Sequence, residues 1–340
     1  MKSIVVCARL FAVALMLLPL AGTSVAQQQE TQQQRAQSQP YNNAPTWRDV
    51  RSGKEEYTSI KGRETGVLVQ TYGETWRQLK NGWITPLVGW AIALVVVVIG
   101  AFYRWRGPLK VHGAPTGRLI QRFTLFERYV HGVVAISFSI LGVTGLVIML
   151  GKYLLLPVIG YTLFAWLTQI SKDLHNFAGP VFVVSLLMFI VMFLKDNLPR
   201  LYDIGWLMKA GGMISGEHVP SGRFNAGEKL WFWGGVVVLS LIVSASGLIL
   251  DFPNFDQVRA VMIEANVVHA VAAGAVMAIS LGHIYLGSIG LEGAYEAMRY
   301  GYVDEAWAKE HHEYWYNDIK SGKIKAGTAS GVPVAPQAQH

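Results

Sequence analysis

The sequence contains almost no cysteine and little charge. Cys7 is the single cysteine among 340 residues, and it lies in the N-terminal leader. Disulfides, iron–sulfur ligation and thiolate zinc sites are therefore excluded from the mature chain. Charged residues make up 15% of the chain and hydrophobic residues 52%. This composition is too apolar for an ordinary soluble domain and is typical of a protein that crosses a membrane several times.

Several soluble functions find no support in the sequence. It contains neither the HExxH pattern of a zinc hydrolase nor the glycine-rich loop of a nucleotide-binding protein. The net charge of +7 does not indicate nucleic acid, because lysine and arginine mark the ends of apolar stretches. That distribution suits membrane topology better than a stripe that binds nucleic acid.

The N-terminal region has the pattern of a secretory leader. In residues 1–26, Lys2 and Arg9 accompany a short apolar core, and small residues precede a cleavage site after Ala26. An uncleaved anchor is the alternative. With cleavage, residues 27–82 form a polar periplasmic segment, and its Gln-rich beginning is expected to be a disordered linker.

Five apolar stretches are long enough to span a bilayer. They are Trp83–Phe102, Tyr129–Leu150, Leu174–Leu194, Leu230–Leu250 and Asn266–Ile289. Lysine and arginine concentrate in the loops on one side, which places those loops and the C-terminus in the cytoplasm. The sequence thus predicts an all-α integral protein of the bacterial inner membrane. A sixth apolar stretch, Tyr153–Ile170, is interrupted by Pro157 and Gly160, and we expect it to be a helix on the outer membrane surface.

Two histidines in the last apolar stretch are the most informative residues. His269 and His283 are fourteen positions apart. In a helix this spacing returns a side chain to within about 40° of its starting direction and advances it about 21 Å. One helix would therefore present two imidazoles on one face, one near each side of the membrane.

Two more histidines complete two pairs at matching depths. The predicted topology places His131 beside His283 on the inner side and His175 beside His269 on the outer side. Ionisable residues within spanning helices usually face the interior and bind something. Each pair could supply two axial nitrogens to one haem iron in a helix bundle. A proton relay or an interhelical hydrogen bond is the alternative for a single histidine.

Other residues near these pairs have plainer explanations. Gly142, Gly145, Gly179 and Gly274 would let a flat macrocycle approach, although small residues also serve ordinary packing between membrane helices. The remaining histidines lie in polar loops or the tail. Among them, His311-His312 is expected to be a solvated surface rather than a metal site.

Several motifs together resemble the cytochrome b (gamma) subunit of membrane-bound formate dehydrogenases. They are ERYVH ending at His131, DLHNFAG around His175, FNAGEKLWFW from Phe224, NVVHAVAAGAVMAISLGHIY and GYVDEAWAKEHHEYWY. The resemblance covers residues 118–316. It implies a di-haem cytochrome b four-helix bundle with a cytoplasmic tail over residues 118–320. The apolar stretch at 83–103 is expected to be an extra N-terminal transmembrane helix, which the shortest members of this family lack, and residues 321–340 are expected to be a disordered tail.

The resemblance also implies which residues bind the cofactors and the acceptor. His131, His175, His269 and His283 would be the axial ligands of two haems b. Asn225 and Gly227 would lie at a quinone site near His283, and Glu228 stands where some relatives carry glutamine. From the residues alone, FNAGEK predicts a helix that begins with Asn225 as N-cap. Arg128, one turn before His131, could pair with a haem propionate or mark the cytoplasmic side.

The sequence and the resemblance together predict an electron-transfer subunit that lacks formate chemistry of its own. An iron–sulfur (beta) subunit would deliver electrons from a molybdopterin or tungstopterin catalytic (alpha) subunit, and a membrane quinone would accept them. The cytochrome b subunit of a nickel–iron hydrogenase is the nearest alternative. A proton-coupled transporter would show further intramembrane acids and internal repeats. A haem-free anchor would leave four membrane histidines without a role.

Overall fold

The computed structural model describes residues 44–53, 56–57, 67–69, 72–255, 257–325 and 328–329. The predicted signal peptide lies outside these residues, as do much of the polar segment and residues 330–340 of the predicted disordered tail. The chain divides into two compact units, Met1–Gln78 and Leu79–His340. The first unit contains the helices α3 (Ala44–Ser52) and α4 (Gly73–Gln78) and the antiparallel strands β1 (Glu56–Tyr57) and β2 (Val67–Val69).

Five helices in the described residues are long and apolar enough to cross a membrane. They contain α5 (Thr85–Arg106), α6 (Leu125–Leu154), α7 (Leu156–Phe193), α10 (Ser240–Asp251) and α11 (Arg259–Tyr285). The π-helical segments η1 (Leu79–Ile84), η3 (Trp231–Leu239) and η4 (Leu286–Gly290) adjoin α5, α10 and α11, and α9 (Ala226–Leu230) precedes η3. The prediction of five apolar spanning helices is confirmed.

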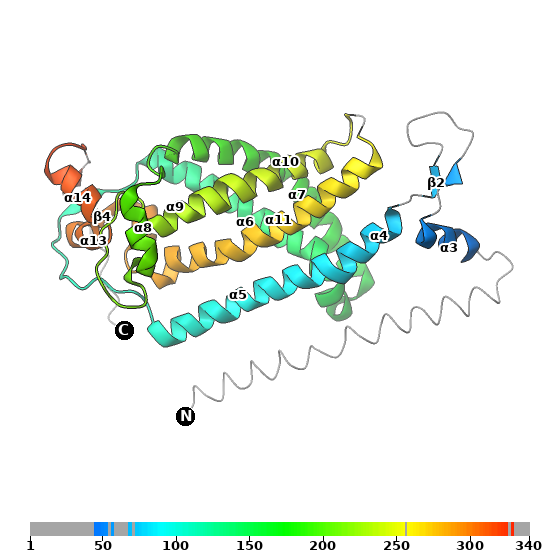
Figure 1. Ribbon diagram of the computed structural model, residues 1–340, viewed down its shortest axis with the longest axis horizontal. Helices are drawn as coiled ribbons and strands as arrows, with labels where there is room; N and C mark the ends of the chain where they lie inside the picture. Colours follow the sequence, from blue (N-terminus) through cyan, green and yellow to red (C-terminus); the bar gives the residue numbers. More distant parts are fainter. Residues whose placement is uncertain are drawn as a thin grey trace, which may run out of the picture. The chain divides into compact units, whose positions relative to one another are not determined.

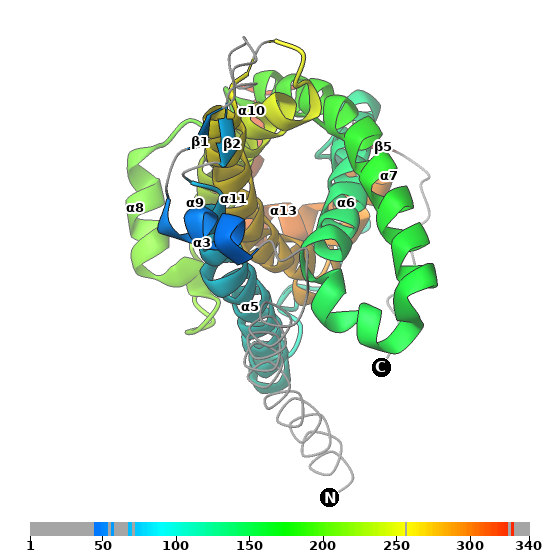
Figure 2. The ribbon, with the colours of Figure 1, turned by 90° about the vertical axis from the view of Figure 1, so that its right-hand side faces the viewer.

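Four of these helices form a bundle in the second unit. Contacts join α6 to α7, α7 to α10 and α10 to α11, while α5 packs against α11. Figure 1 shows the long helices running side by side, and the end-on view of Figure 2 shows α6, α7, α10 and α11 arranged as a ring. The helix α5 lies outside this ring. The expected four-helix bundle with one additional helix is therefore present.

The stretch Tyr153–Ile170 differs from the prediction of a separate surface helix. Its first two residues end α6, and the residues from Leu156 join the following span in one helical element, α7, in which Gly160 has a non-helical φ of 73°. Glycine adopts this conformation without a Cβ clash, so the chain turns there and resumes the helix at once. From Gly160 to Phe193 only Pro180 lacks a backbone donor, and the helix continues through it. The expected separate surface helix is wrong because no second break follows Gly160 within Leu156–Phe193.

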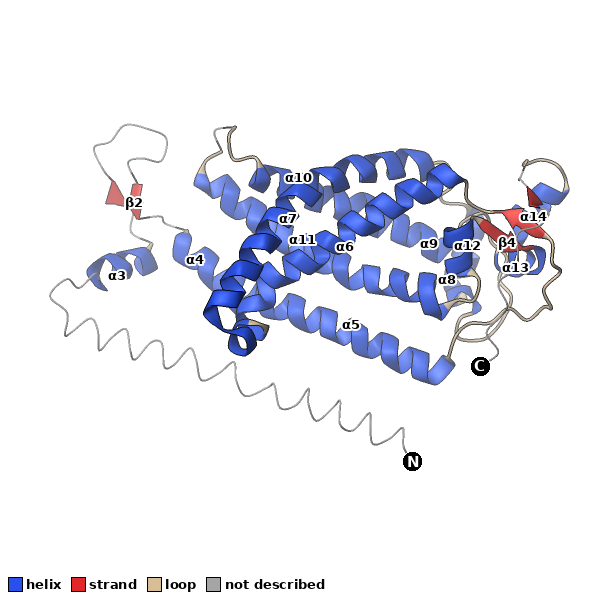
Figure 3. Ribbon diagram, turned by 180° about the vertical axis from the view of Figure 1, so that it is seen from behind, coloured by secondary structure: helices blue, strands red, loops and turns tan. Residues whose placement is uncertain are grey.

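A small lobe closes the end of the bundle where α6 begins and α11 ends. In this lobe, β3 (Leu119–Gln121) pairs antiparallel with β4 (Tyr302–Asp304) and β5 (Thr328–Ala329). Three short helices complete it: α12 (Ala294–Tyr300), α13 (Glu305–His311) and α14 (Glu313–Lys320). We call these elements the C-terminal lobe, and it lies at one end of the bundle in Figure 3. The helices α8 (Leu201–Met208) and η2 (Ala210–Gly212) lie between α7 and α9 in the chain.

The buried core lies at the junction of the bundle and the C-terminal lobe. Phe123, Phe193 and Phe232 of the bundle end pack in one cluster with Trp307 and Trp315 of the lobe. Two helix starts at this junction are fixed by capping boxes, in Thr124 with Glu127 and in Asn225 with Glu228. Each box satisfies two orphan N–H groups and thereby sets where the helix begins.

Candidate functional site

The helix α11 carries two of the four histidines on one of its own faces. His269 and His283 both lie within Arg259–Tyr285, so the helical geometry that the sequence predicts is confirmed. Their fourteen-residue spacing corresponds to about 21 Å along the axis. The neighbouring helix α6 shows the same period: His131 lies near its start, and Gly145, fourteen residues later, lies against His175. A Cβ on Gly145 would lie 3.4 Å from Cε1 of His175.

The structure brings the four histidines together as the two predicted pairs. The ring centroids of His131 and His283 are 6.3 Å apart, and those of His175 and His269 are 6.2 Å apart. The first pair lies at the end of the bundle that adjoins the C-terminal lobe, and we call it the lobe-end pair. The second lies about four helical turns away, and we call it the far-end pair.

These distances fit two imidazoles that share one metal ion. A metal–imidazole bond is about 2 Å long, and a ring nitrogen lies about 1 Å from its centroid. Two rings on opposite sides of an iron atom would therefore have centroids roughly 6 Å apart. A direct hydrogen bond between the rings would place them closer together. Both pairs thus have the spacing of axial haem ligands.

The far-end pair has its ring orientation fixed by oxygen acceptors. Nδ1 of His175 lies 2.9 Å from Oγ1 of Thr144, whose hydroxyl donates to the carbonyl of Ile140. Nδ1 of His269 lies 3.1 Å from the carbonyl oxygen of Val243. Each Nδ1 therefore carries the proton and donates it, which leaves Nε2 with its lone pair for a metal. Such hydrogen bonds fix the tautomer of ligating histidines in metalloproteins.

The lobe-end pair is held by aromatic rings instead. Trp231 stacks on His283 with centroids 5.2 Å apart and planes 15° apart, and Phe189 lies 6.1 Å from His131. Gly235, one turn after Trp231, makes this stack possible: a Cβ there would lie 2.2 Å from the indole. Sequence reasoning missed Trp231, although its spacing from Gly235 in LWFWGG is the signal that could have found it.

A cavity of about 2250 Å³ opens beside the lobe-end pair. Its lining includes His131, His283, Asn225, Gly227 and Arg128, which are the residues that the sequence associates with the inner haem and the quinone. The glycines Gly132, Gly234 and Gly282 also line it, and a Cβ on any of them would meet no atom within 4 Å. The cavity therefore has open space against helix backbones, as a flat macrocycle requires.

Comparison with known proteins identifies the family. The family described as prokaryotic cytochrome b561 matches residues 122–300. This chain belongs to that family. Two similar proteins are the formate dehydrogenase cytochrome b556(fdo) and b556(Fdn) subunits of Escherichia coli K12. The first is 32% identical over 208 residues, covering 59% of this chain and 93% of the relative. The second is 27% identical over 226 residues, covering 63% and 98%.

A third relative gives the same name from another organism. The formate dehydrogenase cytochrome b556 subunit of Haemophilus influenzae is 27% identical over 175 residues, covering 48% of this chain and 72% of the relative. Membership of a cytochrome b family implies haem b as the cofactor. The two histidine pairs of this cytochrome fit that group in spacing, and the far-end pair also fits it in tautomer.

The predicted quinone residues of this cytochrome lie at the start of α9. Asn225 is the N-cap, as the sequence predicts: its side chain accepts from the N–H of Glu228, and the Glu228 carboxylate accepts from the N–H of Asn225. Gly227 provides room for a neighbouring ring, because a Cβ there would lie 3.0 Å from the indole of Trp206. The start of α9, where the sequence predicts quinone binding, is therefore also fixed by the capping box and by the contact between Gly227 and Trp206.

Arg128 and Gly274 have contacts that the sequence did not indicate. The Arg128 guanidinium donates to the carbonyl oxygens of Met298 and Arg299 at the end of α12, so it ties the bundle to the C-terminal lobe. Its pairing with a propionate stays a prediction. Gly274 faces α5 rather than a haem space, since a Cβ there would lie 2.5 Å from Val88.

The histidines of the C-terminal lobe correct one expectation. His312 is not solvated: it is only 1% exposed, and its Nδ1 lies 2.7 Å from the carbonyl oxygen of Gly222. Burial places the pKa of His312 well below its usual value. The exposed surface expected for His311-His312 is therefore wrong, because α13 turns this dipeptide toward the bundle. Within the described residues, no cluster of three or more potential ligands could hold a separate metal ion.

Arg122 is a buried cation that sequence reasoning also missed. Its side chain is 3% exposed, and it pairs with Glu228 at 3.2 Å between Nη2 and Oε1. Four aromatic rings lie within 6 Å of the guanidinium carbon; they belong to Phe123, Phe224, Trp307 and Trp315. Burial lowers the pKa of Arg122 to about 10, so it remains charged at neutral pH. Through these contacts Arg122, which directly follows β3, connects the start of α9 to the tryptophans of the C-terminal lobe beside the cavity.

Proposed function

We propose that this chain is the electron-transfer subunit of a membrane-bound formate dehydrogenase and delivers electrons to quinone. The observation that carries the proposal is the presence of two bis-histidine pairs at two depths of one membrane bundle. The relatives named as formate dehydrogenase cytochrome subunits support formate as the electron donor of the complex. Formate oxidation itself belongs to a separate catalytic subunit that holds molybdopterin or tungstopterin.

Two haems b, when bound, supply one-electron carriers that change redox state without bond formation. The chain's own residues determine where these carriers lie and how they are oriented. His175 and His269 would hold the far-end group, and Thr144 and Val243 fix the orientation of their ring nitrogens. His131 and His283 would hold the lobe-end group. The fourteen-residue spacing of His269 and His283 within α11 keeps the two positions about 21 Å apart along the axis, which spans most of a bilayer.

The acceptor is a membrane quinone bound beside Asn225 and Gly227. The capping box uses the N–H groups of Asn225 and Glu228. The amides of Ala226 and Gly227 lie in the same first turn, where N–H groups have no intrahelical acceptor. They are suitable donors to a quinone carbonyl, and developing negative charge is also favoured at a helix N-terminus.

The orientation in the membrane follows from the positive-inside rule. Lysines and arginines concentrate in the segments at the lobe end, and this supports a cytoplasmic C-terminal lobe and a far-end pair that lies toward the periplasm. The partner iron–sulfur subunit then docks at the far end. Electrons cross from the periplasmic side to the cytoplasmic side, and quinone reduction takes protons from the cytoplasm, so the membrane potential increases.

An optical difference spectrum of membranes that carry the assembled complex tests this proposal. Formate is expected to reduce b-type haem as dithionite does, and His269→Ala is expected to remove this formate response. The control Phe177→Leu changes a side chain that is 78% exposed on α7 and should leave the spectrum unchanged. If dithionite alone reduces the haem, formate is not the donor and hydrogen is tested next. A folded protein without haem would refute the electron-transfer function.

A further inference from the structure

The large cavity extends beyond the space beside the lobe-end histidines. Its lining continues into the C-terminal lobe and includes the histidines His112, His218 and His311 together with the carboxylates Glu310 and Glu313. A haem and a quinone ring need apolar walls, whereas this part of the lining is rich in titratable groups. The role of these groups is not explained by the ligation of haem or the binding of a quinone carbonyl.

Two histidine–carboxylate pairs form the exposed rim of this cavity. Nδ1 of His112 lies 2.6 Å from Oε1 of Glu310, and Nε2 of His218 lies 2.8 Å from Oε2 of Glu313. The His112 side chain is 78% exposed and that of His218 is 43% exposed. Imidazole and carboxylate groups act as general acids and bases and can exchange protons with water. The rim therefore presents proton-exchanging groups to water at the cavity.

His311 lines the same cavity and is less exposed than the two rim histidines. It follows Glu310 in α13, and its electrostatic neighbours include Glu310, Arg122, His218 and His112. Its Nε2 is buried and has no hydrogen-bond partner among the described residues. Buried polar atoms in proteins are almost always satisfied by protein or ordered water. Because His311 lines the cavity, a water molecule there is the natural partner of this nitrogen.

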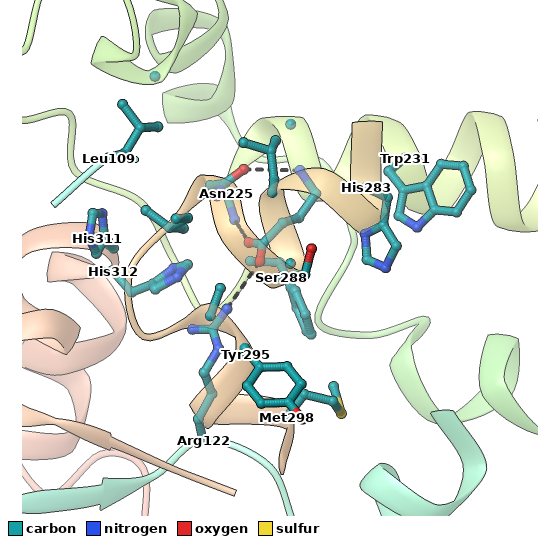
Figure 4. A pocket seen from close by; sticks show the side chains of 18 of the residues that line it. Leu109, Arg122, Asn225, Trp231, His283, Ser288, Tyr295, Met298, His311 and His312 are labelled. Atoms are coloured by element: carbon teal, nitrogen blue, oxygen red, sulfur yellow. Dashed lines mark hydrogen bonds and ion pairs between the residues drawn. The ribbon is translucent and has the colours of Figure 1, made fainter. Parts of the chain in front are cut away.

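Arg122 and Glu228 connect His311 to the quinone residues. Nη1 of Arg122 is buried without a partner among the described residues, and Nη2 binds Glu228. The second oxygen of Glu228 accepts from the N–H of Asn225 at 2.8 Å. Figure 4 shows the resulting order: His311 and His312 lie on one side, Arg122 and Asn225 in the middle, and His283 on the other side. Glu228 is thus the carboxylate that touches both the cation and the quinone site.

We propose that Glu228 passes protons to the reduced quinone, and that His311 and the rim pairs supply them through water in the cavity. This inference rests on the proposed quinone site. The quinone gains two electrons from the electron-transfer activity proposed above and two protons through Glu228. For each proton, an O–H bond of Glu228 breaks as an O–H bond forms on a quinone oxygen, and the carboxylate then takes the next proton from cavity water.

The charges around Glu228 suit this role. Arg122, the residue directly after β3, pairs with it and stabilises the carboxylate between transfers. The adjacent cation Lys229 is engaged elsewhere, because its Nζ binds Asp203 of α8 at 2.8 Å. His311, the last residue of α13, and His312, which follows it, interact electrostatically with Arg122. Glu228 therefore has one cationic partner and one open side, which the cavity provides.

The chain offers a closely matched control for Glu228. Glu127 has the same position in a capping box, with Thr124 as N-cap, and it also pairs with an arginine, Arg223, at 2.8 Å. The difference that the comparison uses is that neither Glu127 nor Arg223 lines the cavity. Replacing each glutamate by glutamine keeps an oxygen that can accept the backbone N–H and removes the ability to carry a proton.

The experiment uses the assembled complex, reduced with stoichiometric dithionite and mixed with menadione in a stopped-flow instrument. Haem oxidation is followed optically, and proton uptake is followed with a pH-sensitive dye. Glu228→Gln is expected to slow both signals about 100-fold, as the loss of a general acid does, whereas Glu127→Gln stays within about twofold. Equal rates in Glu228→Gln and the native complex overturn the proposal. A native complex whose haem menadione does not oxidise refutes the quinone function itself.

Two further variants separate proton transfer from a purely structural role. Glu228→Asp keeps a carboxyl group and is expected to recover most of the rate lost in Glu228→Gln. If both variants are equally slow with normal haem spectra, Glu228 acts only as a helix cap and the proposal fails. His311→Gln is expected to slow proton uptake about tenfold and to be rescued by added imidazole, which replaces a lost proton carrier. A slow His311→Gln that imidazole does not rescue overturns the His311 step.

Discussion

Trp231 stacks on His283 because Gly235 has no side chain. The two rings are nearly parallel at 15°, and the indole occupies the space where a Cβ of residue 235 would lie. The stack occurs at the start of the π-helical segment η3, where the wider helical turn changes the direction of the side chains. One histidine of the lobe-end pair is thus positioned by a residue on a different helix.

Gly235→Ala is expected to disturb the lobe-end haem selectively. The added methyl group would force the indole away from His283, at a cost of about 1–3 kcal/mol in folding free energy as in other overpacked sites. The midpoint potential of one haem should shift while that of the other stays constant, as measured by redox titration. Gly100→Ala is the control, because a Cβ there meets no atom within 4 Å. Equal shifts in both haems would contradict the assignment.

The long helices and the pairing of histidines were predictable because both depend on local rules. An apolar run of about 20 residues must form a helix in a bilayer. The spacing of His269 from His283 then follows from helical geometry alone. The position of Gly160 was also visible, but its effect was misjudged. A single glycine turns the chain, and the following residues Tyr161–Ile170 are good enough helix formers to join α7 directly.

The C-terminal lobe could not be predicted in the same way. Arg122 is caged by residues that lie about 100 to 190 positions away in the sequence, at Phe224, Trp307 and Trp315. No periodicity links them, so a charged residue at 122 suggests only a marker of topology. His312 was misjudged for the same reason. Its flanking acids and aromatics look exposed until β3 and β4 pair and bring α13 against the bundle.

Double substitutions test whether each histidine pair holds one haem. Removing both members of one pair, as in His175→Ala with His269→Ala, should leave one haem per chain. Removing one member from each pair, as in His175→Ala with His283→Ala, should leave none. The reason is that a bis-histidine site needs both axial nitrogens for a stable low-spin haem. Haem is counted against protein in purified material. Equal haem contents in the two double variants would refute the pairing seen at 6.2 and 6.3 Å.

Gly274 is expected to control the attachment of α5 to the bundle. In Gly274→Ala the new methyl group would lie 2.5 Å from Val88, so α5 must move away from α11. Overpacking of this kind costs about 1–3 kcal/mol. The additional change Val88→Ala should restore much of the loss, because it removes the side chain that clashes. Thermal unfolding of the detergent-solubilised protein measures the coupling. Additive effects of the two changes would show that Gly274 and Val88 do not pack together.

Acidification is expected to loosen the C-terminal lobe between about pH 6.5 and pH 4. Burial lowers the pKa of His311 to about 4 and that of His312 well below 6.5. Arg122 and His218 favour the neutral form of His311, and Glu310 opposes them. Below pH 6.5 the unfolded chain binds protons that the folded lobe does not, so stability falls as the pH falls.

Glu305 does not account for a loss of stability above pH 4.5. Hydrogen bonds from Lys320 and Tyr316 hold its pKa at about 2. Its contribution to stability is therefore complete above the unfolded value of 4.5 and is lost only as the pH falls from there toward 2. Hydrogen exchange of α13 and α14, recorded from pH 7.5 to pH 5, isolates the histidines. His312→Gln should reduce the pH dependence, because glutamine keeps a donor for Gly222 and has no proton to gain. If the pH dependence of hydrogen exchange is unchanged in His312→Gln, a group other than His312 causes the loss of stability.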